Sequence, residues 1–201
     1  IMIKEGLLQD YNIDEIYALH NWPELPLGHF GVSSGPMMAA VDEFDIIIKG
    51  KGGHAAIPDL TIAPVIIAGQ LITAIQTIIS RVTSPIDKAL ISITKVNVGT
   101  AYNVIDDDAF LAGTVRTFKE STRKNIENKL LSLSKGITQA NGADIEFKYK
   151  LGYPPTINSK NESIFAGEVA KELVGEKNVV NEIDPSMGGE DFSYFLNEKP
   201  G

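Results

Sequence analysis

Four stretches of the chain show the alternating or β-branched pattern of strands. In residues 145–151, apolar side chains occupy every odd position and charged side chains every even one. Residues 44–49 alternate less strictly, and residues 90–98 and 110–118 are rich in β-branched side chains. Because successive side chains of a strand point to opposite faces, the first pattern predicts a strand with one face in water. We predict strands over all four stretches.

Two longer stretches show the helical period. Residues 61–80 carry apolar side chains at helical spacing on two sides, with Thr61 as the expected N-cap and Pro64 in the first turn. A helix that is apolar on two sides is expected to contact more than one surface. A second helix with one apolar face is expected to start at Ser121 or Thr122 and to end at Asn141-Gly142.

The order of these elements predicts the fold class. From residue 42 to 152 the order is β-α-β-β-α-β, which is typical of a ferredoxin-like antiparallel sheet with two helices on one face. Residues 1–20 suggest a helix and then a strand, and residues 159–174 an amphipathic helix. We therefore expect an α/β domain in two pieces, residues 1–41 and 153–201, with an α+β module at 42–152 inserted between them.

Composition argues against several classes of partner and site. The net charge is −8, with 18 basic and 26 acidic residues, which argues against nucleic acid as a partner. The chain has no cysteine and so no thiolate metal site. The longest apolar stretch, residues 62–79, is interrupted by proline, glycine and glutamine, so we expect no membrane span. No charged-then-apolar leader is present, and a cytoplasmic location is the default expectation.

Two histidines precede the predicted insert. His20 ends the predicted strand of "DEIYALH", and strand ends of α/β sheets are where functional residues collect. Histidine is the commonest metal ligand, so His20 is a candidate ligand; the alternative is a histidine hydrogen-bonded to a turn. His29 has no acidic neighbour at ligand spacing, which favours a structural role.

A third histidine, His54, lies in the glycine-rich segment "GKGGHAAIPDL" between a predicted strand and a predicted helix. Glycine suits a freely bending turn, so the histidine is either incidental to the turn or presented to a site elsewhere. In the second case it could donate a hydrogen bond to a developing oxyanion.

The connection "GTAYNVIDDDA", residues 99–109, is longer than the roughly two to five residues of a simple hairpin, which favours a functional loop. It presents Asn103, and its run of acids at 106–108 is either a cation site or a solvated loop. In the next strand Arg116 shares a face with Thr114 and Phe118. Arg116 either holds a carboxylate or forms a cross-strand ion pair.

The segment "SMGGEDFSYF" places Gly188 and Gly189 before an acidic first helical turn. Free backbone N–H groups at a helix start favour anions, but Glu190 and Asp191 already supply negative charge there. This signal is weak by itself.

Taken in order, "ALHNWP", "GKGGHAAIP", "YNVI", "GTVRTF" and "MGGEDFSYF" resemble one family. They are similar to the amidohydrolase branch of the dinuclear zinc metallopeptidases of the aminoacylase and carboxypeptidase G type. That branch includes hippurate hydrolases, N-acyl-amino-acid deacylases and hydrolases of indoleacetyl-amino-acid conjugates. The resemblance implies a zinc-peptidase-like catalytic domain with a ferredoxin-like dimerisation or lid domain inserted in it.

The resemblance also implies roles. His20 would be a metal ligand, and His54, assisted by Asn103, would stabilise the oxyanion in the active site of the other subunit of a homodimer. Arg116 would hold the α-carboxylate of the substrate, and Gly188 and Gly189 would line its pocket. The implied reaction is hydrolysis of an N-acyl amino acid with two divalent ions, zinc or manganese, that activate a water.

The chain departs from the family pattern. The chain lacks three features of the family: the amino-terminal metal motif, the Glu-Glu pair and the carboxy-terminal histidine ligand. Asp59 and Asp106 stand where the family usually has a histidine and a proline. We therefore expect an internal segment of a longer enzyme that is inactive by itself. The alternative, from another functional class, is a metal-free dimerisation or ligand-binding module.

Overall fold

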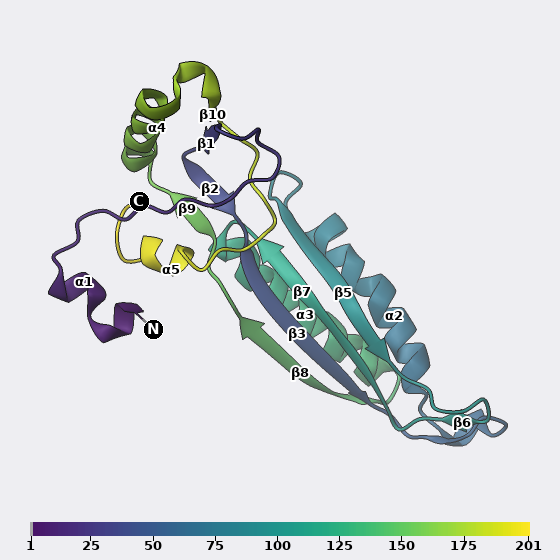
Figure 1. Cartoon of the computed structure of the whole chain (residues 1–201). Coiled ribbons are helices and arrows are strands. Elements are labelled where there is room, and N and C mark those ends of the chain that lie inside the picture. The colour runs from purple at the N-terminus through teal and green to yellow at the C-terminus, as the bar shows by residue number, and fades with distance from the viewer. Residues whose placement is uncertain (1) are drawn as a thin grey trace. The chain divides into compact units, whose positions relative to one another are not determined.

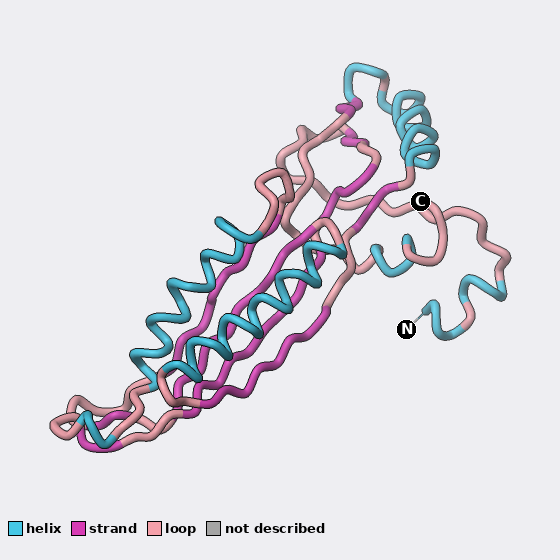
Figure 2. The backbone as a smooth tube through the Cα atoms, turned by 180° about the vertical axis from the view of Figure 1, so that it is seen from behind, coloured by secondary structure: helices cyan, strands magenta, loops and turns pink. Residues whose placement is uncertain are grey.

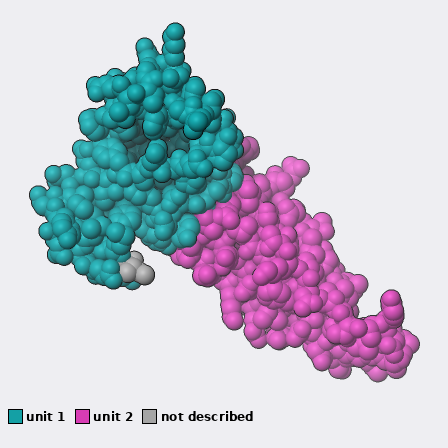
Figure 3. Space-filling model, viewed as in Figure 1, with its two compact units in different colours: residues 1–40, 153–201 teal, residues 41–152 magenta. Residues whose placement is uncertain are grey.

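The computed structural model describes residues 2–201, which form two compact units. One unit comprises Ile1–Ala40 with Tyr153–Gly201, and the other comprises Val41–Gly152 (Figure 3). We refer to them as the split unit and the continuous unit. The chain passes from one to the other at residues 40–41 and 152–153.

The continuous unit is built on a four-stranded sheet (Figure 1). Its strands are β3 (Ala40–Lys49), β5 (Ala89–Asn97), β7 (Asp108–Thr117) and β8 (Asp144–Leu151), in the order β5-β7-β3-β8. β8 pairs antiparallel with β3, and β5 pairs antiparallel with β7. The four strands expected from alternation and β-branching are thereby confirmed.

Two helices, α2 (Pro64–Thr77) and α3 (Glu120–Ala140), cover one face of this sheet (Figure 2). A π-helical turn, Ile78–Val82, extends α2. The core between helices and sheet contains the fully buried side chains of Phe44, Ile46, Ile48, Leu71, Ile75, Leu111, Ile126 and Leu130. Burial of one such side chain is worth about 1.5–3 kcal/mol, so this layer accounts for much of the stability of the unit.

The helix starts differ slightly from expectation. α2 has Ala63 as its N-cap rather than Thr61, with Pro64 at the first helical position, where its missing N–H costs nothing. α3 begins at Glu120, one residue earlier than expected. Its predicted end is confirmed, because Gly142 adopts a φ of 76° and its N–H bonds to Gln139 O (3.0 Å).

Among residues 2–201, Pro64–Val82 is the one helix long and apolar enough to cross a membrane by length and composition. The side chains of Ile67, Leu71 and Ile75 on its inner side are buried in the core of the continuous unit. Val65 and Ile66 on its outer side are 48% and 60% exposed. The two apolar sides expected from the sequence are therefore one core face and one open face.

The split unit contains two small sheets and several short helices. β1 (Phe30–Val32) pairs parallel with β10 (Val179–Asn181), and β2 (Gly35–Met38) pairs antiparallel with β9 (Thr156–Asn158). The helices are α1 (Leu7–Asp10), α4 (Lys160–Val174) and α5 (Ser193–Leu196), with 3₁₀ turns at Met2–Glu5 and Glu176–Asn178.

The strand expected at residues 14–20 is wrong, because the structure assigns no regular element to these residues. A strand requires a neighbour along its length, whereas the backbone bond from Ile16 N–H to Pro200 O (3.0 Å) joins this segment to the chain at a single point. His20 therefore follows an irregular segment rather than a strand.

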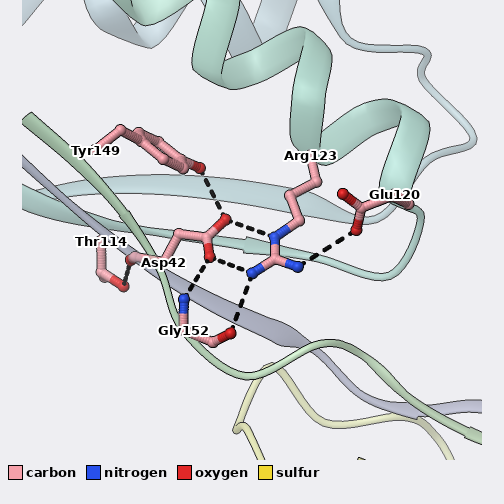
Figure 4. Close-up of polar contacts among 6 residues, drawn as sticks. All are labelled: Asp42, Thr114, Glu120, Arg123, Tyr149 and Gly152. Atoms are coloured by element: carbon pink, nitrogen blue, oxygen red, sulfur yellow. Dashed lines mark hydrogen bonds and ion pairs between the residues drawn. The ribbon is translucent and has the colours of Figure 1, made fainter. Parts of the chain in front are cut away.

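A buried ion pair between Arg123 and Asp42 lies where the chain enters and leaves the continuous unit (Figure 4). The Arg123 guanidinium donates to both carboxylate oxygens of Asp42, at 2.8 Å from Nε. Asp42 also accepts from the Tyr149 hydroxyl (2.9 Å) and from the Gly152 N–H (3.0 Å). Because Asp42 and Gly152 lie where the chain enters and leaves the unit, this network ties its first and last strands to α3.

The same network perturbs the ionisation of its members. Hydrogen bonds to Asp42 raise the pKa of Arg123 above its usual value, so the guanidinium remains charged in spite of its burial. Burial, together with the charge of Asp42, raises the pKa of Tyr149 well above its usual value, so its hydroxyl remains a donor.

Candidate functional site

The structure brings His54 and Asn103 together. His54 lies on the short strand β4 (Gly53–His54), which pairs antiparallel with β6 (Val104–Ile105), so that His54 is opposite Val104. The N–H of Ala55 donates to Asn103 O (3.0 Å) and continues the pairing by one residue. Figure 1 shows β6 at the end of the sheet where β3 stops and β7 begins. Both residues line one open hollow of about 620 Å³.

The glycines around His54 serve close packing rather than free bending. A Cβ at Gly50 would lie 2.3 Å from Ile62 O, and a Cβ at Gly52 would lie 2.5 Å from Ile105 O. Neither glycine has a positive φ. What this turn requires is therefore the close approach of two backbones, which only glycine permits.

The backbone fixes which ring nitrogen of His54 carries the proton. Nδ1 lies 3.1 Å from the backbone N–H of Ala56, which can only donate, so Nδ1 accepts. In the neutral imidazole the proton is then on Nε2. Since the side chain is exposed, its Nε2–H is available to donate to an oxygen of a ligand.

The acidic run beside this hollow ties the loop together. The Asp106 carboxylate accepts from the Gly99 N–H (2.7 Å) and from the Thr100 hydroxyl (2.8 Å). The Asp107 carboxylate accepts from the Gly52 N–H (2.8 Å), and Asp108 lies 3.6 Å from Lys49. Of the two alternatives left by the sequence, these contacts favour a loop held by its own carboxylates over a cation site.

Arg116 lies on β7 opposite Leu90, half-buried and outside the hollow of His54 and Asn103. Within residues 2–201, no hydrogen bond or ion pair engages its guanidinium. Thr114, on the same face of β7, donates its hydroxyl to Asp42 O (2.8 Å). The cross-strand ion pair considered from the sequence is therefore not formed within the described residues, and the guanidinium is left available.

In the split unit, His20 lies beside the carboxylate of Glu190, a contact that the sequence analysis did not predict. His20 Nε2 lies 3.4 Å from Glu190 Oε2, and the two side chains are 46% and 28% exposed. Nδ1 lies 2.7 Å from the carbonyl of Asn21, which can only accept, so Nδ1 donates. Trp22 contacts the imidazole edge-on, with 5.8 Å between ring centroids. These residues line a hollow of about 760 Å³.

Glu190 is held by the turn that precedes it. Ala39 N–H donates to the carbonyls of Ser186 (3.1 Å) and Gly188 (2.8 Å), which ties this turn to the end of β2. Glu190 Oε1 accepts from the N–H of Phe192 (3.2 Å). Gly188 and Gly189 do not line the hollow, whereas Glu190 does.

The matches with known proteins agree with the resemblance. The sequence model of the family described as Peptidase family M20/M25/M40 matches residues 1–201. The chain belongs to this family. An N-acetylcysteine deacetylase of Bacillus subtilis (strain 168) is 40% identical over 200 residues, which cover 100% of this chain and 51% of the relative. A hippurate hydrolase of Campylobacter jejuni is 38% identical over 198 residues, which cover 98% of this chain and 52% of the relative.

Among solved structures, a dinuclear metal-binding peptidase of the M20 family from Bacillus subtilis superposes with a TM-score of 0.80. It is 35% identical and matches 100% of this chain and 49% of its own. The mixed α/β architecture is thus that of the M20 peptidases, and the expected resemblance to its amidohydrolase branch is confirmed. The chain spans about half the length of the curated relatives that it matches.

His20 and Glu190 have the chemistry to hold a metal ion of such a peptidase. Because Nδ1 of His20 donates to a carbonyl, the neutral ring has its lone pair on Nε2, directed at a carboxylate. Two such acceptors lie close together favourably only when a proton or a cation is between them. This pair fits a divalent cation, with the backbone carbonyl orienting the ring as is usual for ligating histidines. Within residues 2–201, no group of three or more candidate ligands occurs.

Proposed function

We propose that this chain is one half of a metal-dependent amidohydrolase that hydrolyses N-acyl amino acids to a carboxylic acid and a free amino acid. The names of the relatives support this proposal, since one is a deacetylase of N-acetylcysteine and another a hydrolase of hippurate. The observation that carries it is that the β4–β6 pairing brings His54 beside Asn103, the residue before β6, with His54 Nε2–H available to donate.

Each predicted residue then has a role. His20, opposite Glu190, would hold one of two divalent ions, zinc or manganese, which when bound lower the pKa of a water and polarise the amide carbonyl. His54 and Asn103 would donate to the oxygen on which negative charge develops. Arg116, whose guanidinium has no partner within residues 2–201, would bind the α-carboxylate bidentately. Gly188 and Gly189 would bring their backbone close to the substrate.

We further propose that residues 42–152 are a ferredoxin-like dimerisation or lid domain, inserted between catalytic-domain pieces at 1–41 and 153–201. The strand order β5-β7-β3-β8 and the two helices on one face support this assignment. The exposed outer side of α2 is an apolar surface that a second copy could cover. In such a homodimer His54 would act in the site of the partner. The cytoplasmic location stays a prediction.

The test uses the full-length protein that contains these residues, loaded with zinc or manganese, with N-acetyl and N-benzoyl amino acids as substrates. We expect hydrolysis, and we expect His54→Gln to lower kcat by about 100-fold or more, the usual cost of removing an oxyanion donor. Tyr102→Ala is the control, because Tyr102 is fully exposed in the same loop as Asn103. No hydrolysis by the loaded protein would refute the enzymatic assignment and favour the metal-free module.

Metal content tests the claim that this chain is one half of the site. After loading with zinc and removal of free ion, we expect fewer than one tightly held ion per 201-residue chain, since no group of three ligands occurs within residues 2–201. Two tightly held ions per chain would show that the chain contains a complete dinuclear site.

A further inference from the structure

The hollow that holds His20 and Glu190 is larger than a metal site needs. Its volume of about 760 Å³ lies in the range of small-molecule pockets, roughly 300–1,000 Å³. Its walls are mainly apolar and come from segments far apart in the split unit: Trp22, Leu25, Phe30, Met37, Ile183 and Phe192. Such walls suit the apolar body of a ligand.

Two residues that line this hollow each have a buried polar atom without a hydrogen-bond partner within residues 2–201. Within residues 2–201, four buried side-chain polar atoms lack one, and two of them, His29 Nδ1 and Thr156 Oγ1, belong to residues that line the hollow. Thr156 is only 5% exposed. An unpaired buried polar group costs about 1–3 kcal/mol, so two of them beside one pocket call for a partner from outside residues 2–201.

The local structure holds both residues in place. Thr156 is the first residue of β9 and pairs with Met38 on β2, which also lines the hollow. His29 follows Gly28, whose φ of 81° turns the chain, and its N–H bonds to Pro26 O (3.1 Å). Asn158, a third polar residue of the lining, already donates to Ser33 O (2.9 Å). The unpaired atoms are therefore those of His29 and Thr156, and both are on ordered backbone.

We propose that this hollow binds the acyl group of the substrate, and that His29 and Thr156 select acyl chains that end in a hydroxyl or amide. This assignment rests on the proposed amidohydrolase function. The apolar walls receive the chain, and the polar end of the acyl group pairs with the imidazole and the hydroxyl. An acyl chain of equal length that ends in a methyl group leaves both protein groups unpaired. A site of this kind therefore discriminates more strongly than an apolar pocket does.

The fluorescence of Trp22 can report ligand binding, because Trp22 is the single tryptophan of the chain and lines the hollow. The 201-residue chain is titrated, without metal, with N-(6-hydroxyhexanoyl)glycine and with N-heptanoylglycine, whose acyl groups have the same number of heavy atoms. We expect both ligands to change the Trp22 emission, and the hydroxylated one to bind about tenfold more tightly, as expected for one or two added hydrogen bonds. Equal affinities, or no change in emission, would overturn the assignment.

Variants test whether His29 and Thr156 cause the tighter binding of the hydroxylated ligand. Thr156→Val keeps the size of the side chain and His29→Phe keeps a planar ring, and both remove the polar atom. Each should bring the ratio of the two affinities towards one, whereas Thr156→Ser should keep it. Thr117→Val is the matched control, because Thr117 Oγ1 is also buried and unpaired but lies in the continuous unit. A ratio that Thr156→Val and His29→Phe leave unchanged would refute the roles of these residues.

The outcome is independent of catalysis. If the full-length protein hydrolyses N-acyl amino acids but the chain shows no preference, the acyl selectivity fails and the amidohydrolase assignment stands. If the preference is found but the metal-loaded protein hydrolyses no N-acyl amino acid, the binding site stands and the proposed reaction fails.

Discussion

Replacing Arg123 with methionine tests whether the buried ion pair holds the continuous unit together. Arg123 and Asp42 are 6% and 1% exposed, and the substitution leaves the Asp42 carboxylate with no guanidinium to compensate its charge. Removing one partner of a buried pair costs about 3–5 kcal/mol. Since whole domains are stable by only about 5–15 kcal/mol, this loss is a large fraction of the total.

The assay is urea unfolding of the 201-residue chain followed by far-ultraviolet circular dichroism. With a slope of about 1.5 kcal/mol per molar urea, the loss corresponds to a midpoint lower by about 2 M or more. Lys150→Met is the matched control, because Lys150 on β8 pairs with Glu43 (3.2 Å), the residue after Asp42 on β3, and both side chains are mostly exposed. It should cost at most about 1 kcal/mol.

Equal, small effects of Arg123→Met and Lys150→Met would refute this reasoning, because burial would then not distinguish the two pairs. The double variant with Asp42→Asn gives a second check. If the cost of Arg123→Met is the uncompensated charge of Asp42, the double variant should be more stable than the sum of the single effects predicts.

Three further predictions follow from single contacts. Gly52→Ala should disrupt the pairing of β4 with β6 and lower the activity of the full-length protein, since its Cβ would lie 2.5 Å from Ile105 O. Gly136→Ala on α3, with nothing within 4 Å, should leave the activity unchanged. The pKa of Asp87 is lowered by hydrogen bonds from Lys119 and Thr122, so its contribution to stability is complete above its usual value of 3.8 and is lost as the pH falls through the lower folded-state pKa. Asp87→Asn should flatten the pH dependence of the unfolding midpoint in that acidic range, and an unchanged profile would contradict the assignment. In ¹⁵N spectra of the neutral imidazoles, His20 should carry its proton on Nδ1 and His54 on Nε2; the same tautomer for both would contradict the hydrogen bonds.

The regular elements of the continuous unit were predictable because each obeys one local period. The alternation over 145–151 marks β8 to within one residue, and the Asn141-Gly142 signal marks the end of α3. The segment 14–20 has the same strand-like composition, but strand formation depends on a neighbour, which no local period reports. The strand order within the sheet likewise depends on contacts between distant residues.

The site was predictable only in part, for the same reason. The sequence indicates both His54 and Asn103, and their proximity follows from the β4–β6 register, which the glycine-rich segment permits. Glu190 was visible as an acid after two glycines, but its position opposite His20 is a contact across 170 positions. Asp42 and Arg123, 81 positions apart, gave no signal, since a polar residue at the start of a strand and an arginine on a helix are both ordinary.

The two histidines show how backbone geometry can assign opposite chemistry to one side chain. At His20 a carbonyl acceptor, Asn21 O, fixes the proton on Nδ1, so Nε2 offers a lone pair to a cation beside Glu190. At His54 an N–H donor, that of Ala56, occupies Nδ1, so Nε2 carries the proton and can donate to an oxyanion. A metal ligand must be a lone-pair donor and an oxyanion stabiliser must be a proton donor. Each local hydrogen bond thus selects the tautomer that the proposed role of its histidine requires, although neither contact involves a ligand.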